Sequence, residues 1–451
     1  MSLEPKTIIL LVPVVIIALY FLIKYPEVSF ALFINAYVLK GGINFGYFNL
    51  TAILLVVTVV GFILKQLIQR DKGAINLNFK LESTDKFLLL FVAVLVIGCI
   101  YSINRNGGII KALRFIVLVF IPYLLARIFL VKGTQIKLFL ISVSITALGI
   151  SFLLVLISIF GEYTGGRMYF LQANSIPVSV LLMVGLIIFL IGITQNIFNE
   201  GKYGKLFCAI AIIPLLYSIF LVARRGPLIS AIVGLIFGVL ILLKTKITGR
   251  NTTIILIISL ILILVGISCF DIIYTSLFSN EVTPKTNQII TEVEKIIPNI
   301  ERFSLNNAKN MSVNNRLKHY SDAWQLFKNN PLFGIGTGGF PEGYPHNIFL
   351  EIAAENGLLG LIIFFGFLFT ICQKGYQFLN DNFIEINKQE KIMSLVILII
   401  GVSLFVERQF SFGLDMHKDL FVFFGLIVNL QLTKPRNKED VFFKEGNKHE
   451  L

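Results

Sequence analysis

Residues 174–193 read NSIPVSVLLMVGLIIFLIGI, a run without a single charged side chain. An α-helix of about 20 residues crosses the roughly 30 Å hydrocarbon core of a bilayer. Similar runs recur along almost the whole chain, because its 451 residues are 56% hydrophobic and only 14% charged, with 42 phenylalanines. A soluble domain of this size needs far more charge to cover its surface. The sequence therefore predicts an all-α, polytopic membrane protein.

About a dozen runs are long enough to be transmembrane helices. Outward from the quoted run, we expect spans at residues 7–23, 50–64, 87–101, 109–131, 136–160, 174–193, 206–222, 227–243, 252–270, 358–373, 392–406 and 420–432. The first run lacks a charged n-region and a cleavage site, so we expect it to be retained. Residues 28–47 are broken by Lys40-Gly41-Gly42 and form either a short span or a re-entrant hairpin. The total is 12 or 13 transmembrane helices.

The distribution of Lys and Arg predicts which loops face the cytoplasm, where membrane proteins concentrate these residues. One set of short segments holds 21 of them: 65–86, 127–137, 202–205, 244–250, 374–391 and 434–448. The intervening set holds 8: 102–114, 161–172, 223–226 and 407–419. We therefore place the first set in the cytoplasm and the second set outside. This bias also accounts for the net charge of +13, which we do not attribute to nucleic-acid binding.

The chain then divides into four parts. Residues 1–270 form an N-terminal transmembrane bundle, 271–356 a large periplasmic loop, 357–432 the C-terminal spans and 433–451 a cytoplasmic tail. Within the large loop, apolar residues at helical spacing predict two amphipathic helices, at 289–300 and 313–327. The apolar stripe of the second helix consists of Val313, Leu317, Tyr320, Trp324 and Phe327.

Further signals in the large loop define its end. Asn330-Pro331 should end the second helix, and the glycines of 334–339 should allow a close backbone approach. Asn347 is well placed to cap a short helix through Glu355, which Gly357 separates from the next span.

Charged residues on the predicted outer side are the candidates for chemistry. Arg224 and Arg225 lie between two apolar runs, Arg316 lies in the second loop helix, and Arg167 lies in a short loop. A guanidinium suits a phosphate group because it offers a rigid fork of donors and keeps its charge. The alternatives are interfacial snorkelling for Arg224, a solvated position for Arg316, and pairing with Glu162 for Arg167.

His346 is the histidine with the strongest local signal, because Pro345-His346-Asn347 stands at the start of a span. An imidazole with a pKa near 6.5 can accept a proton from a sugar hydroxyl, or hold that hydroxyl by a hydrogen bond. We expect no catalytic role for the other histidines: His319 lies on the polar side of its helix, His417 in a loop and His449 in the tail.

Metal and nucleotide chemistry have little support in the sequence. Gly334-x-Gly336-x-Gly338 follows a helix rather than a strand, so it lacks the context of a dinucleotide loop. No Asp-x-Asp or Asp-Asp pair lies in an outward loop, which argues against a glycosyltransferase that needs a divalent cation. The four cysteines (Cys99, Cys208, Cys269 and Cys372) have no CxxC spacing and fit packing positions rather than disulfides or metal ligands.

Two groups of these residues resemble signatures of a known family. The segment Leu221-Val222-Ala223-Arg224-Arg225-Gly226-Pro227-Leu228 resembles the Ser-Arg-Gly signature of the O-antigen ligase and polymerase superfamily, with Arg224 where serine is usual. The stretches 316–336, His346-Asn347-Ile348-Phe349-Leu350-Glu351 and Glu355-Asn356-Gly357-Leu358-Leu359-Gly360 are similar to its second signature. The resemblance covers about residues 220–370, and Arg167 fits it more loosely.

The resemblance implies a multi-pass glycosyltransferase of the bacterial inner membrane, with its active site facing the periplasm. The donor is a saccharide on undecaprenyl pyrophosphate, transferred with inversion and without a metal or other cofactor. By position, Arg225 and Arg316 bind the pyrophosphate, Arg224 and Arg167 are further candidates, and His346 engages the acceptor hydroxyl. A chain-length regulator or a flippase is the kind of protein partner expected.

Three functions stay open at this point. A polymerase adds the growing glycan to a new lipid-linked repeat unit of a surface polysaccharide, whereas a ligase transfers the finished glycan to lipid A–core, forming lipopolysaccharide, or to a protein. We expect a polymerase, because polymerases are numerous and the chain shows no added acceptor domain. A non-enzymatic transporter or flippase should carry charges in mid-span, and only Lys111 and Arg114 fit that description.

Overall fold

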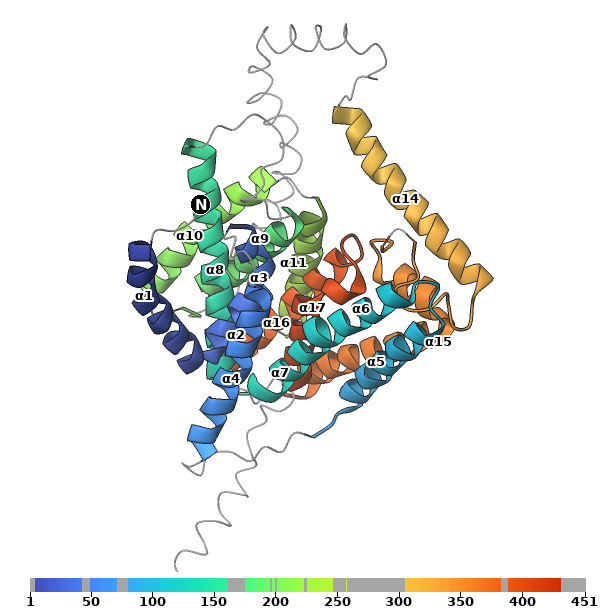
Figure 1. Cartoon of the computed structure of the whole chain (residues 1–451). Coiled ribbons are helices and arrows are strands. Elements are labelled where there is room, and N and C mark those ends of the chain that lie inside the picture. The colour runs from blue at the N-terminus through green and yellow to red at the C-terminus, as the bar shows by residue number, and fades with distance from the viewer. Residues whose placement is uncertain are drawn as a thin grey trace, which may run out of the picture.

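The computed structural model describes residues 5–42, 49–70, 80–160, 175–194, 197–198, 201–222, 225–245, 257, 305–341, 343–382 and 388–430. Every regular element in these ranges is helical, as predicted (Figure 1). The α-helices are α1 (Pro5–Lys24), α2 (Pro26–Ile34), α3 (Ala36–Gly42), α4 (Leu50–Arg70), α5 (Ser83–Tyr101), α6 (Arg105–Phe115), α7 (Ile121–Phe129), α8 (Gly133–Phe160), α9 (Ser175–Thr194), α10 (Lys202–Val222), α11 (Arg225–Thr245), α14 (Leu305–Asn329), α15 (Ile348–Gln377), α16 (Lys388–Glu407) and α17 (Lys418–Asn429). Single turns are η1 (Ile116–Phe120), η3 (Phe378–Asn382) and η4 (Leu414–Met416).

Nine helices in the described ranges are long and apolar enough to cross a membrane, or up to ten if the bent pair α1–α2 forms one span. The chain turns by 104° between these two helices, where Pro26 starts α2. Each of these nine helices coincides with a predicted run, which confirms a polytopic all-α membrane protein. The predicted span at 420–432 forms α17, which has 12 residues and is too short to cross a bilayer as a straight helix. The expected span at 252–270 lies outside the described residues, apart from residue 257.

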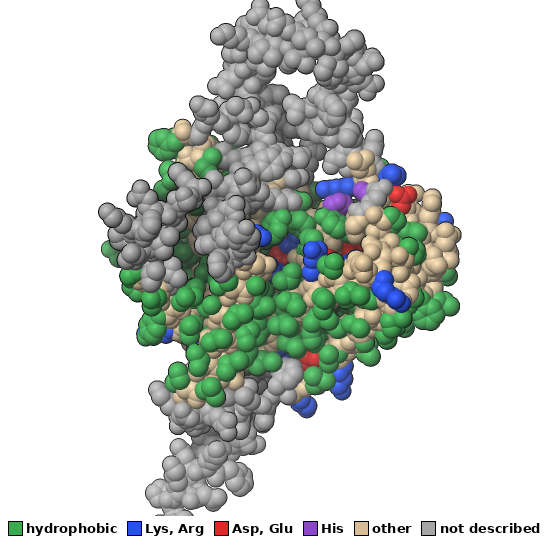
Figure 2. Space-filling model, viewed as in Figure 1, with side chains coloured by type: hydrophobic (Ala, Val, Ile, Leu, Met, Phe, Trp, Pro, Cys, Tyr) green, Lys and Arg blue, Asp and Glu red, His purple; other side chains and the backbone are tan. Residues whose placement is uncertain are grey.

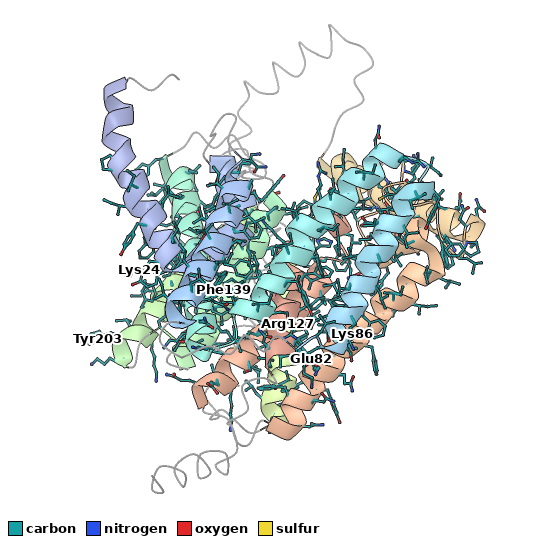
Figure 3. All side chains as sticks on the ribbon, turned by 60° about the horizontal axis from the view of Figure 1, so that its bottom comes forward. Lys24, Glu82, Lys86, Arg127, Phe139 and Tyr203 are labelled. Atoms are coloured by element: carbon teal, nitrogen blue, oxygen red, sulfur yellow. The ribbon has the colours of Figure 1, made fainter. Side chains whose placement is uncertain are left out.

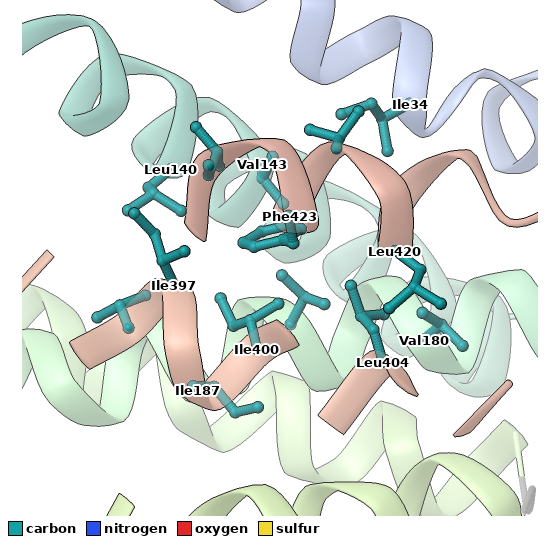
Figure 4. Packing of buried hydrophobic residues seen from close by; sticks show 14 of the residues in the cluster. Ile34, Leu140, Val143, Val180, Ile187, Ile397, Ile400, Leu404, Leu420 and Phe423 are labelled. Atoms are coloured by element: carbon teal, nitrogen blue, oxygen red, sulfur yellow. The ribbon is translucent and has the colours of Figure 1, made fainter. Parts of the chain in front are cut away.

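The apolar run at 174–193 forms α9, one of the most enclosed helices of the bundle. It contacts α8, α10, α11 and α16, and its side chains from Val180 to Ile191 are almost all buried. A helix that is apolar on every side is stable in lipid or among other helices, and α9 lies among other helices. Figure 4 shows this core from close by, with Val180 and Ile187 of α9 beside residues of α8, α16 and α17. Cys99 and Cys208 are buried free thiols and Cys372 is an exposed one, whereas Cys269 lies outside the described residues.

At one end of the bundle, three segments predicted to be cytoplasmic meet. Lys374 in α15 donates to Glu82 before α5 at 2.8 Å. Arg127 binds both carboxylate oxygens of Asp85, at 3.1 and 3.0 Å, and Tyr123 donates to the same carboxylate at 2.6 Å. Figure 3 shows Glu82, Lys86 and Arg127 close together. Arg127 was expected in the loop 127–137, but it is buried in α7, where Asp85 neutralises its charge.

A second group of segments, all predicted to face outward, meets elsewhere in the structure. The amide of Ile103 donates to the carbonyl of Ile335 in the large loop, and the amide of Leu414 donates to Glu351 at the start of α15. In each predicted set, loops thus contact other loops of the same set. The side of the membrane on which each set lies remains a prediction.

α14 confirms the second predicted loop helix, which ends at Asn329, directly before Asn330-Pro331. Its buried face differs from the predicted stripe, because Ala323 and Leu326 pack against Phe340 and Leu350. Two members of that stripe, Leu317 and Trp324, are exposed instead. The predicted helix at 289–300 lies outside the described residues.

Candidate functional site

The loop that follows α14 is fixed by glycines against three helices. Gly334, Gly336 and Gly338 all have positive φ, between 68° and 90°. A Cβ on Gly336 would lie 2.3 Å from the Cα of Ser102, a distance that no side chain tolerates. Ile335 and Gly336 donate to the carbonyls of Ala354 and Glu355, and Thr337 donates to that of Gly98. This confirms the close backbone approach expected of these glycines.

The same loop leads into the predicted short helix at the start of α15. Asn347 is its N-cap, and its side chain accepts a hydrogen bond from the amide of Leu350 at 3.0 Å. At Gly357 the backbone leaves the helical region, with φ 63° and ψ −157°, and α15 continues beyond this kink. The cap and the break both lie where the sequence predicted them, and together they fix the position of His346 just before the helix.

His346 has a strained backbone and an unsatisfied side chain. Its φ is 60°, and Phe412 is the only other non-glycine residue with positive φ in the described part of the chain. Such conformations cost free energy and persist mainly at functional sites. The buried Nδ1 of His346 has no hydrogen-bond partner among the described residues. The ring of Tyr344 lies 4.7 Å away, edge to face, and that of His319 lies 6.1 Å away, centroid to centroid.

The surroundings of His346 keep its imidazole neutral. Burial, followed by the positive charge of Arg316 and the influence of His319, lowers the pKa of His346 to about 4. The value near 6.5 assumed from the sequence is therefore wrong, because the sequence shows neither the burial nor the nearby guanidinium. At neutral pH the ring is therefore uncharged and can accept a hydrogen bond.

Arg316 lies on α14, half-buried, close to His346. It also acts electrostatically on Glu407, at the end of α16. The structure thus brings together two of the predicted site residues, Arg316 and His346. Figure 2 shows histidine and basic side chains gathered on one face near α14.

The other predicted arginines are only partly covered by the structure. Arg225 is the first residue of α11, but its side chain is not among those described, and Arg224 and Arg167 lie outside the described residues. The backbone of the next residue, Gly226, is described by the structure. A Cβ on Gly226 would lie 4.0 Å from the Cβ of Phe410. The residue before Phe410 accepts a hydrogen bond at 3.4 Å from Asn347, the neighbour of His346. The start of α11 therefore meets the loop that contacts the His346 segment.

A buried ion cluster supports the site from behind. Lys111 of α6 lies 2.5 Å from Glu351 and 2.6 Å from Glu355, both on the first turns of α15. Glu351 also accepts the amide of Leu414 with both oxygens, at 3.1 and 3.0 Å. Next to it, Asp415 lies 3.9 Å from Arg114. The cluster ties α6, α15 and residues 408–417 to one another.

Residues 209–365 match the family model described as O-antigen ligase. The chain carries an O-antigen ligase family domain. The matched range contains Arg225, Arg316 and His346, so it covers both segments whose resemblance the sequence suggested. No curated protein matches the chain.

The O-antigen ligase family domain also contains polar residues whose positions the sequence did not reveal. Glu351 and Glu355 belong to the recognised motifs, yet their contact with Lys111 joins positions 240 and 244 residues apart. His319 was expected on a solvated face but lies next to His346. The one sequence signal of this contact was Lys111, a lone lysine in an apolar run, since a buried charge requires a partner.

Proposed function

We propose that this chain transfers a saccharide from an undecaprenyl-pyrophosphate carrier to an acceptor hydroxyl at the periplasmic face of the bacterial inner membrane. The observation that carries the proposal is His346, which is neutral, strained and unsatisfied, beside Arg316 inside an O-antigen ligase family domain. The periplasmic placement is supported by the excess of Lys and Arg in the opposite set of loops.

In the proposed reaction, the bond between the anomeric carbon and the pyrophosphate oxygen breaks as the acceptor oxygen bonds to the opposite face of that carbon. The hydroxyl proton passes to the imidazole of His346, and the anomeric configuration inverts. Arg316 and Arg225 would stabilise the negative charge on the departing pyrophosphate, because guanidinium groups fixed in advance need no reorganisation during the reaction. His346 gains basicity when the donor arrives, since the pyrophosphate offsets the charge of Arg316 that lowers its pKa.

The acceptor that we propose is a second lipid-linked repeat unit, which makes the chain a polymerase of O-antigen or another surface polysaccharide. The test is purified protein supplied with a single lipid-linked repeat unit. A ladder of longer glycans is the expected product, with heat-inactivated protein as the control. Repeat units that stay unchanged both alone and with any acceptor would contradict transfer altogether.

Ligation is the second candidate, and the description of the matched family as O-antigen ligase favours it. A ligase leaves the repeat unit unchanged until lipid A–core or a protein acceptor is added. The same assay with and without lipid A–core therefore separates the two reactions.

The charge at the start of α11 provides a further prediction. Arg225→Lys keeps the positive charge but loses the planar fork that holds two phosphate oxygens. We expect turnover to fall by about tenfold or more, which corresponds to about 1.4 kcal/mol of transition-state stabilisation. Arg224→Lys is the matched control and should have a smaller effect, because lysine snorkels as well as arginine. Protein levels in the membrane are measured for both variants. Full activity in Arg225→Lys with loss in Arg224→Lys would show that the neighbouring arginine binds the donor.

The pH dependence should differ between the free enzyme and its donor complex. The neutral form of His346 is lost only as the pH falls through about 4 in the free protein. We therefore expect kcat/KM to stay level from about pH 8 to about pH 5, since it reports groups of the free enzyme. The acid limb of kcat should lie at higher pH, because bound pyrophosphate raises the pKa of His346. Two identical limbs near the ordinary histidine value would contradict this account.

A further inference from the structure

The end of α14 and the loop that follows it carry large apolar side chains that no part of the described structure covers. Trp324 is 47% exposed on α14, and Leu332 and Phe333, just beyond the end of the helix, are 62% and 57% exposed. Figure 1 shows this end of α14 beside α15. A single exposed apolar residue needs no explanation, but three large ones in one short segment form a patch that needs a covering surface.

The backbone of this loop is fixed, although its side chains are exposed. The amide of Leu359, just after the kink of α15, donates to the carbonyl of Leu332 at 3.2 Å. The hydroxyl of Tyr101, the last residue of α5, donates to the carbonyl of Phe333 at 2.8 Å. Two helices of the bundle therefore hold the loop in place, and the exposure of Leu332 and Phe333 is a property of the fold.

The patch continues the exposed apolar sides of two candidate membrane spans. Ile97 and Ile100 of α5 and Ile362 of α15 are exposed, and both helices are long and apolar enough to cross a bilayer. The 19 residues of α5 span about 28 Å, close to the thickness of the hydrocarbon core, so Tyr101 at its end lies near one boundary of that core. Because Phe333 is bonded to Tyr101, it lies at the same depth.

The last turns of α14 have the chemistry of a membrane–water boundary. The Nζ of Lys328 lies 5.6 Å from the centre of the Trp324 ring, and the ring of Phe327 lies 5.4 Å from it. Tryptophan gathers at the level of the lipid head groups, and lysine can cover apolar surface while its ammonium reaches the phosphates. Ala323 and Leu326 pack on the protein, so α14 uses a different face for that contact and leaves Trp324 available.

We propose that Trp324, Lys328, Leu332 and Phe333, here called the foot of α14, dock this helix on the bilayer surface. Trp324 and Lys328 lie among the head groups, and Leu332 and Phe333 reach the upper part of the acyl chains. Lipid is the partner because it already covers the adjoining sides of α5 and α15. Arg316 lies eight residues before Trp324, about 12 Å along the helix, so the docked foot sets the distance of its guanidinium from the bilayer. The docking does not rest on the proposed function.

The test uses the indole itself, because Trp324 is the only tryptophan in the chain and all tryptophan emission reports this position. The full chain is placed in phosphatidylcholine vesicles, with or without phosphatidylcholine that carries bromine on the upper part of its acyl chains. Bromine quenches an indole that it contacts. We expect the brominated lipid to lower the emission by about twofold or more, since a docked indole lies at the level of the head groups. Emission that the brominated lipid leaves unchanged would overturn the proposal, whether the indole faces water or another protein copy.

A double variant tests whether the foot holds Trp324 at the bilayer. Leu332→Ser with Phe333→Ser removes the two inserted side chains, and thermal melting checks that the protein stays folded. We expect quenching by the brominated lipid to fall by about twofold, and quenching by acrylamide in the water to rise. Tyr203→Ser is the matched control, because Tyr203 is an exposed aromatic residue on α10, which packs on α8 and α9; it should keep the wild-type quenching. Unchanged lipid quenching in the folded double variant would overturn the proposal. Neither measurement involves glycan transfer, so a failure here is distinct from a failure of the proposed function.

Discussion

Replacing His346 with asparagine is expected to lower kcat by about 10²- to 10⁴-fold, the range that a positioned acid–base group contributes. Asparagine is chosen because it tolerates the positive φ of this position. Alanine would add a backbone cost of about 1–2 kcal/mol at this φ. A loss of activity could then not be assigned to the missing imidazole alone. The amide of asparagine can still accept a hydrogen bond from a hydroxyl, but it cannot take the proton. Single-turnover rates with a defined lipid-linked donor measure the effect.

The comparison with His319→Asn makes this prediction specific. His319 lies on α14 with its ring 6.1 Å from that of His346, so it shares the surroundings. We expect a much smaller loss from this variant, because our mechanism gives His319 no proton to transfer. A larger loss in His319→Asn than in His346→Asn would show that the roles are reversed. Near-complete activity in His346→Asn would show that His346 holds the acceptor hydroxyl without removing its proton.

The elements that the sequence predicted correctly are those determined by local physics. The apolar run at 174–193 has to be a helix that lies in lipid or among other helices, because no side of it can face water. Asn347 caps its helix through an amide three residues away. Each of these features depends on residues close in sequence, so a pattern in one segment is enough to predict it.

The features that escaped prediction depend on contacts between distant segments. The lowered pKa of His346 arises from burial and from Arg316, 30 residues earlier in the chain. The buried face of α14 is determined by Phe340 and Leu350, so the apolar stripe of the isolated helix pointed to the wrong side. The proximity of Arg225 to His346 is still a prediction, although Gly226 packs near Phe410.

Lys111→Met is expected to lower the free energy of unfolding by about 3–5 kcal/mol, the usual effect of leaving buried charges without their partner. Among the described residues, Lys111 is the one cation in contact with both Glu351 and Glu355, and both carboxylates are almost inaccessible to solvent. Methionine has a similar length and retains the packing of the aliphatic part. Thermal melting of the purified protein in detergent micelles measures the loss.

Lys374→Met is the matched control for this substitution. Lys374 pairs with Glu82 at 2.8 Å, but both side chains are partly exposed, at 17% and 26%. Water can replace a partner there, so we expect a loss of about 0–1 kcal/mol. A second variant, Lys111→Met with Glu355→Gln, removes one of the two carboxylate charges that are left without a cation. It should recover part of the lost stability. Equal losses in Lys111→Met and Lys374→Met would contradict a buried cluster.

The cluster should also matter for turnover per folded molecule, because it links α15 to residues 408–417. Glu351 accepts the amide of Leu414 with both oxygens, and Lys111 holds that carboxylate in place. Without Lys111, Glu351 can turn away from Leu414, and residues 408–417 lose one of their attachments to the helix that begins beside His346, while the hydrogen bond from Asn347 to Gln409 remains. We therefore expect folded Lys111→Met protein to have a lower kcat than the wild type, and Lys374→Met protein to match it. Normal kcat in the folded fraction of Lys111→Met would restrict the cluster to a role in stability.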